Sequence, residues 1–259
     1  MCDIMIELRG VSKAYYMKRN MSRARIVLDN INLKIEDHEF VCIIGPSGCG
    51  KTTALNIIAG FESPTLGECY CDGEKVEKPS PKRGVVFQDY SLFPWMSAKG
   101  NVMLALECLN VPEKDREAIA MDALKRVRMA EYADMRPNTL SGGMRQRVAI
   151  ARLLAMDPDI MLMDEPFSAL DEYTRSILDK DIVDIWSEEK KTVVFVTHII
   201  DEALTVATRI ILLSDSPGKI VKEWRLEPGS ERDLTSPEFI ALKKEIMENL
   251  VSNSKEYNI

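Results

Sequence analysis

The 259-residue sequence has little of what several large classes of protein require. It holds only two histidines, and its six cysteines show neither paired CxxC spacing nor a disulfide-scaffold pattern, which predicts free thiols and no zinc site. No apolar run approaches the roughly 18 residues of a membrane-spanning helix. Asp3 and Glu7 lie where a secretion signal would be basic and then apolar, so we expect no signal peptide.

Positive charge is also scarce. The chain has 34 Lys and Arg against 41 Asp and Glu, a formal net charge of −7. A protein that coats nucleic acid needs a basic surface, because phosphate contacts dominate its affinity, so we expect no nucleic-acid partner. The remaining composition, 46% hydrophobic and 29% charged, is typical of a globular chain of one or two domains.

Short apolar runs alternate with stretches of helical spacing along most of the chain. The predicted strands are residues 4–8, 27–35, 40–44, 85–87, 160–163, 193–196 and 210–213. The predicted helices are residues 51–59, 113–129, 143–156, 172–189, 201–207 and 237–251. Because strands that alternate with helices usually form a parallel sheet covered by those helices, the pattern predicts an α/β fold.

We expect one domain over residues 1–259, with a mostly parallel sheet, a small antiparallel β subdomain and an inserted helical subdomain. The expected parts are a core with the antiparallel portion at residues 1–88 and 157–230, a helical subdomain at 89–156, and a C-terminal helical tail at 231–259. A basic stretch at residues 17–25 separates the first two strands. We expect it to be a solvated excursion of a hairpin.

Residues 45–52, Gly-Pro-Ser-Gly-Cys-Gly-Lys-Thr, fit the phosphate-loop pattern G-x-x-x-x-G-K-[ST] between a strand and a helix. Glycines let backbone N–H groups curl around a polyphosphate, and the helix start attracts anions. We expect Lys51 to reach the β- and γ-phosphates and the Thr52 hydroxyl to bind Mg²⁺. The predicted nucleotide-binding residues of this segment are Gly45, Pro46, Ser47, Gly48, Cys49, Gly50, Lys51, Thr52 and Thr53.

An acid pair, Asp164 and Glu165, closes the apolar run at residues 160–163. Ligands of open α/β sheets bind at the carboxyl ends of the strands, which is where this pair lies. We expect Asp164 to hold Mg²⁺ through water. Glu165 is expected to polarise an attacking water, either as a general base or by orienting it.

A second anion site is predicted at Leu140-Ser141-Gly142-Gly143, where a Ser-Gly-Gly turn opens a helix. Two phosphate-binding helix starts with one loop lysine suggest a site shared between chains. Together with the phosphate loop and the acid pair, this LSGG signature resembles the ATP-binding subunits of ABC transporters over nearly the whole chain. The resemblance implies a P-loop NTPase core, ATP and Mg²⁺ as cofactors, and hydrolysis of ATP to ADP and phosphate.

The same resemblance implies roles for further residues. Gln88 matches the glutamine that meets Mg²⁺, the attacking water and the transport partner, and His198 matches the switch histidine at the γ-phosphate. Asp171 ends the Ser-Ala-Leu-Asp loop that crosses the dimer interface. Tyr15 resembles the aromatic on which adenine stacks, with Tyr16 as its competitor.

In this family two chains pair head to tail, as a homodimer or with a similar ATPase. The ATP lies between the phosphate loop of one chain and Ser141, Gly142 and Gly143 of the other. The family resemblance thus implies that catalysis rests on Glu165, His198 and Gln88, and metal binding on Thr52, Gln88 and Asp164.

Residues 87–95, 164–175 and 216–220 resemble the importer subunits of the nitrate, sulfonate and taurine group. This implies a peripheral protein at the cytoplasmic face of the cell membrane, bound to a separate integral-membrane permease and served indirectly by an extracytoplasmic solute-binding protein. The implied solute is small and anionic. Importers of thiamine precursors or bicarbonate remain open as alternatives.

A second class also remains open, because DNA-associated ABC ATPases share the LSGG signature. Those proteins usually insert a long coiled coil between the phosphate loop and the signature, for which the segment from Lys51 to Leu140 leaves no room. A plain P-loop kinase would lack both the signature and Gln88.

Overall fold

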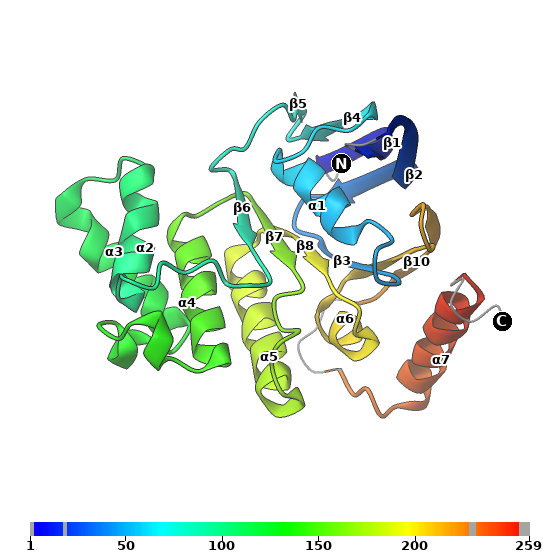
Figure 1. The fold of residues 1–259 in the computed structure, drawn as a ribbon. Coiled ribbons are helices and arrows are strands. Elements are labelled where there is room, and N and C mark those ends of the chain that lie inside the picture. Colours follow the sequence, from blue (N-terminus) through cyan, green and yellow to red (C-terminus); the bar gives the residue numbers. More distant parts are fainter. Residues whose placement is uncertain (1–2, 18–19, 228–231, 254–259) are drawn as a thin grey trace.

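The structure is a computed structural model that describes residues 3–17, 20–227 and 232–253. It confirms the α/β class, with two sheets and helices on both faces of the larger one (Figure 1). Among the described residues, every helix is either too short or too polar to cross a membrane.

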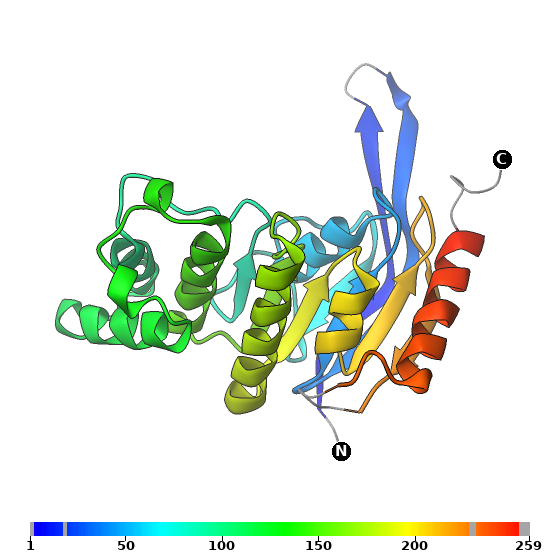
Figure 2. The same cartoon turned by 90° about the horizontal axis from the view of Figure 1, so that it is seen from below.

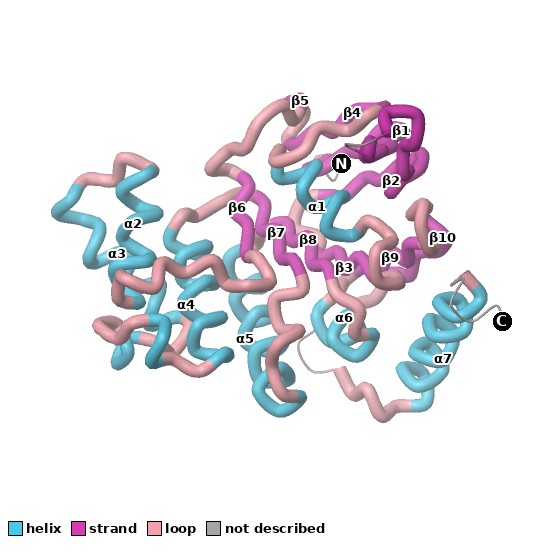
Figure 3. The backbone as a smooth tube through the Cα atoms, in the orientation of Figure 1, coloured by secondary structure: helices cyan, strands magenta, loops and turns pink. Residues whose placement is uncertain are grey.

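The larger sheet has six strands in the order β10-β9-β3-β8-β7-β6. All neighbours are parallel except β10, which runs antiparallel to β9 at one edge. In Figure 3 these strands cross the middle of the molecule. Their bounds are β3 (Phe40–Ile44), β6 (Arg83–Val86), β7 (Ile160–Asp164), β8 (Thr192–Val196), β9 (Arg209–Leu213) and β10 (Ile220–Arg225).

The smaller sheet is antiparallel, in the order β2-β1-β4-β5. Its strands are β1 (Ile4–Met17), β2 (Asn20–Glu36), β4 (Leu66–Cys71) and β5 (Glu74–Lys75). The first two are longer than predicted and form a ribbon whose far end projects from the body of the molecule (Figure 2). Residues 18–19 of the predicted basic excursion lie outside the described residues, and the described part of the stretch continues the two strands.

The helices are α1 (Lys51–Ala59), α2 (Ala98–Cys108), α3 (Glu113–Arg126), α4 (Gly142–Ala155), α5 (Glu172–Glu189), α6 (Ile200–Val206) and α7 (Pro237–Ser252). Two short 3-10 turns, Ala130–Tyr132 and Pro137–Thr139, precede α4. Helices α2, α3 and α4 pack together beyond the β6 edge of the large sheet (Figure 1). The proposed division of the chain at residues 89–156 stays a prediction.

The two faces of the large sheet enter different cores, because successive side chains of a strand point to opposite faces. Val41 and Ile43 pack with α1 and the antiparallel sheet, whereas Phe40 and Cys42 pack on the side of α5 and α6. Helix α1 is therefore enclosed between the two sheets. This enclosure fixes the start of α1 at the carboxyl end of β3.

Candidate nucleotide site

The phosphate loop connects β3 to α1 through two glycines in the left-handed region, Gly48 at φ 78° and Gly50 at φ 105°. A Cβ on Gly50 would lie 2.6 Å from Leu28 Cδ2, so a larger residue there would meet both strain and a clash. Gly50 also caps α1 without any side-chain hydrogen bond. The first N–H groups of the helix are thus left to bind an anion.

Lys51 is buried, with 5% of its surface exposed. Its Nζ donates to the carbonyl oxygens of Gly45 at 2.8 Å and Pro46 at 3.0 Å. The ammonium group therefore lies inside the loop, bound to the backbone that surrounds it. A phosphate entering the loop would meet this cation at short range.

A cavity of about 500 Å³ opens over the loop. It brings together, as predicted, Tyr15, Ser47, Gly48, Gly50, Lys51, Thr52, Thr53 and Glu165. Tyr16 is not among its lining residues, so the structure favours Tyr15 as the aromatic at this site. The Tyr15 hydroxyl donates to Glu62, which orients the ring at the mouth of the cavity.

The acid pair lies beside the loop. The Thr52 hydroxyl donates to Asp164 Oδ1 at 3.0 Å. Burial raises the pKa of Asp164, the hydrogen bond from Thr52 opposes that rise, and the nearby Glu165 charge adds to it. These two hard oxygen donors fit Mg²⁺, and a divalent cation between them would offset the cost of the buried carboxylate.

Glu165 has a positive φ of 43°, and its N–H donates to Val196 O at 2.9 Å. This turn directs the carboxylate toward β8, where Glu165 Oε2 lies 3.1 Å from His198 Nδ1. Ser168 Oγ donates to Glu165 O at 3.0 Å and accepts a bond of 3.3 Å from Gln88 Nε2. Of the predicted catalytic side chains, His198 thus contacts the Glu165 carboxylate directly, whereas Gln88 reaches the Glu165 backbone only through Ser168. Gln88 lies in a turn after β6 and not at the end of a strand through residue 87.

The signature residues lie elsewhere. Ser141 caps α4, its Oγ accepting from Met144 N at 3.3 Å, and Asp171 caps α5, accepting from Thr174 N at 2.9 Å. The two helix starts are neighbours, since a Cβ on Gly143 would lie 2.8 Å from Thr174 Cγ2. Neither Ser141, Gly142, Gly143 nor Asp171 lines the cavity over the phosphate loop.

Three residues of the site were missed from the sequence. Arg25 and Val27 on β2 line the cavity, although they are distant from every motif in the chain. Gly218 packs closely against the backbone of the phosphate loop, because a Cβ on it would lie 2.1 Å from Cys49 O. Only the Ser-Pro-Gly turn at residues 216–218 gave a signal for the last of these.

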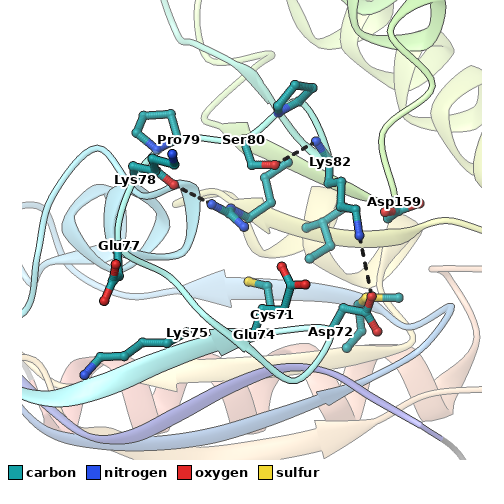
Figure 4. A pocket seen from close by; sticks show the side chains of 14 residues that line it. Cys71, Asp72, Glu74, Lys75, Glu77, Lys78, Pro79, Ser80, Lys82 and Asp159 are labelled. Carbon is teal, nitrogen blue, oxygen red and sulfur yellow. Dashed lines mark hydrogen bonds and ion pairs between the residues drawn. The ribbon is translucent and has the colours of Figure 1, made fainter.

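Two further hollows lie away from these residues. One, of about 510 Å³, is lined by both acids and bases, including Cys71, Asp72, Lys82 and Arg83 (Figure 4). Arg83 donates to Lys78 O at 2.6 Å, and Lys82 Nζ lies 3.8 Å from Asp72 Oδ2. The other, of about 520 Å³, is a largely apolar groove between β6, α2 and α4. We call it the β6 groove.

Comparison with known proteins supports the geometry. A sequence profile described as "ABC transporter" matches residues 28–168. The chain is similar to the aliphatic sulfonates import ATP-binding protein of Bacillus cereus, with 43% identity over 94% of each protein. It is 38% identical to a bicarbonate transport ATP-binding protein of Synechococcus elongatus, over 93% of this chain and 88% of that protein.

Solved structures of ATP-binding cassettes are also similar to the chain. The chain is similar to a dimeric post-hydrolysis state of the ATP-binding cassette MJ0796 bound to ADP and phosphate. The TM-score is 0.76 and the identity 38%, over 86% of this chain and 99% of that one. An uncharacterized ABC transporter ATP-binding protein of Methanocaldococcus jannaschii is 46% identical over 94% of this chain and 90% of its own length.

Proposed function

Since the chain belongs to the ABC transporter family, whose cassettes are ATPases, we propose that it hydrolyses ATP for an importer and that two cassettes enclose the ATP head to tail. The observation that carries this proposal is the separation of the two anion-binding helix starts. Lys51, at the start of α1, lies at the cavity, whereas Ser141, at the start of α4, does not line it. A second chain, identical or similar, would supply the missing signature.

The residues present divide the chemistry between them. Lys51 and the start of α1 bind the phosphates, and Thr52, Gln88 and Asp164 would hold Mg²⁺, which would supply positive charge at the phosphates. Glu165 orients the attacking water or accepts its proton, and His198 holds the Glu165 carboxylate at the γ-phosphate end. Asp171 lies at the interface between the chains.

The β6 groove suits the permease. Phe61 and Phe87 stack in it with ring centroids 5.9 Å apart, and Phe61 and Phe93 remain 48% and 37% exposed. Exposed apolar surface of this kind marks interaction sites. Gln88 follows Phe87 directly, so an apolar segment of a permease seated in the groove would adjoin the catalytic residues. We propose that the ATPase binds such a permease from the cytoplasmic face of the membrane.

We propose a small anionic solute of the sulfonate, nitrate or taurine kind, because the relatives include a sulfonate importer subunit. Bicarbonate is the second candidate solute, because the relatives also include a bicarbonate transport ATP-binding protein. An extracytoplasmic binding protein and the permease would select the solute, and the cassette would supply the energy.

Lys51→Ala tests both the proposed ATP site and the proposed role in solute uptake. Deleting the one cation inside the phosphate loop should weaken binding of ATP by the purified chain at least tenfold, measured by titration calorimetry. In cells deleted for the gene, wild-type chain should restore uptake of labelled taurine or nitrate, and Lys51→Ala should not. Lys75→Ala, in the other cavity, is the control. Undiminished ATP affinity would refute the site, and restored uptake of bicarbonate alone would reassign the solute.

A further inference from the structure

Arg25 occupies an unexpected place at the nucleotide cavity. The sequence assigned it to a solvated basic excursion, but its Cα pairs with that of Tyr15 across β2 and β1. Both side chains line the cavity over the phosphate loop. Arg25 is exposed and lies in the hairpin, as expected, but the two strands continue far enough to carry this residue over the loop.

The guanidinium group of Arg25 points at the phosphate loop. Its Nη2 lies 3.8 Å from the position that a Cβ on Gly48 would occupy. Within the described residues, Arg25 makes no hydrogen bond or ion pair to another side chain. The planar guanidinium group of such an arginine has five N–H donors, and beside a polyphosphate-binding loop these donors can bind phosphate oxygens.

We propose that Arg25 is a second phosphate-binding cation of this site, and that it contacts the part of the nucleotide between the base and the Lys51 end. Arg25 pairs with Tyr15, the expected adenine-stacking residue, and its guanidinium group lies near Gly48 of the loop. Lys51 binds deeper, beside Gly45 and Pro46. The oxygens within reach of Arg25 therefore belong to the α- and β-phosphates, which ATP and ADP share.

This inference rests on the nucleotide site proposed above, and the experiment separates the two. Titration calorimetry with the full chain would compare ATP and ADP for wild type, Arg25→Gln and Arg25→Lys. Arg25→Gln should weaken ATP and ADP by the same factor, about tenfold for one solvent-accessible charge-assisted contact. Arg25→Lys should recover part of the loss, and Arg25→Gln should reduce the salt dependence of binding.

Arg9→Gln is the matched control, because Arg9 lies on the same ribbon, pairs with Glu7 and does not line the cavity. A thermal melt without nucleotide should be unchanged by Arg25→Gln. If Lys51→Ala weakens both nucleotides and Arg25→Gln weakens neither, the Arg25 contact is wrong and the site stands. If Arg25→Gln weakens ATP alone, the contact is to the γ-phosphate and the assignment fails. If Lys51→Ala changes nothing, the proposed site itself fails.

Discussion

Glu165 is the residue on which the proposed chemistry converges, since Ser168 fixes its backbone and His198 its carboxylate. Glu165→Gln keeps the shape of the side chain and removes its basicity. Loss of a general base typically costs roughly 10²–10⁴-fold in rate. We expect this variant to bind ATP, to hydrolyse it at least 100-fold more slowly, and to accumulate as a dimer with Mg·ATP.

Phosphate release and light scattering after gel filtration would measure both effects, with the exposed acid variant Glu188→Gln as the control. A Glu165→Gln chain that stays monomeric and turns over at the wild-type rate would remove Glu165 from catalysis. Gln88 or His198 would then be the candidate.

Single residues of the site were predictable where covalent spacing fixes them. Lys51 and Thr52 follow the glycines of their own loop, and Asp164 and Glu165 close their own strand. Arg25 reaches the cavity only through its register opposite Tyr15, which depends on irregularities along the β1–β2 ribbon. Gly218 acts through a contact with Cys49 that no local pattern contains. Strand register and distant packing are set by the folded chain, so no local pattern predicts that Arg25 lines the cavity.

Among the elements, α5 and α6 pack across a buried acid pair. Asp179 on α5 and Glu202 on α6 are 5% and 3% exposed. Within the described part of the chain, Asp179 Oδ1 and Glu202 Oε1 lack hydrogen-bond partners. Burial, then the Glu202 charge, raises the pKa of Asp179 to about 8, and Arg175 opposes this. Burial raises the pKa of Glu202 to about 7, opposed by Thr197 and Arg175.

Raised carboxyl pKa values mean that the folded chain keeps protons that the unfolded chain, with pKa values of 3.8 and 4.5, has lost. The contribution of the pair to stability is full below about pH 4 and falls as pH rises toward 8. Asp179→Asn removes one of these protons from the equilibrium. We expect it to lose less stability than wild type between pH 5 and pH 8, by roughly 1–3 kcal/mol.

Urea unfolding at the two pH values would measure the difference, with Asp184→Asn, an exposed acid on the same helix, as the control. An equal loss of stability in Asp179→Asn and wild type would show that Asp179 is already ionised in the folded chain at pH 5.

The elements with strong patterns were predicted almost to the residue, as for the wholly apolar β3 and for α1 and α5. Weak patterns failed. No strand was predicted between residues 59 and 85, because β4 carries a glycine, one acid and two cysteines, and β5 spans only two residues. Helix α2 was missed because Gly100 and Asn101 interrupt its first turns, although Ser97 caps it and Asn101 bonds back to Phe93.

At the scale of the whole molecule, the separated anion sites predict that activity belongs to a pair of chains. Ser141→Arg should leave ATP binding by one chain nearly unchanged, because Ser141 does not line the cavity over its own phosphate loop. It should abolish steady-state hydrolysis, because the bulky cation would occupy the other chain's nucleotide site. Titration calorimetry and phosphate release would measure the two properties separately.

Mixing supplies the decisive control for that model. Ser141→Arg and Lys51→Ala chains, each inactive alone, should regain part of the activity when combined, since one of the two composite sites is then fully wild type. Normal hydrolysis by Ser141→Arg alone would exclude a shared site, whatever the mixture does.

The phosphate loop packs against Gly218, which lies between β9 and β10 of the large sheet. Its N–H donates to Val27 O at 2.8 Å, its carbonyl accepts from Asp29 N at 3.0 Å, and its bare Cα lies against Cys49 O. A fragment trimmed to residues 28–168 would contain the loop and the acid pair and still lack this backing, along with β8 and β9 on either side of β3. We therefore expect such a fragment to carry the nucleotide motifs and to bind nucleotide more weakly than a chain that extends past β9.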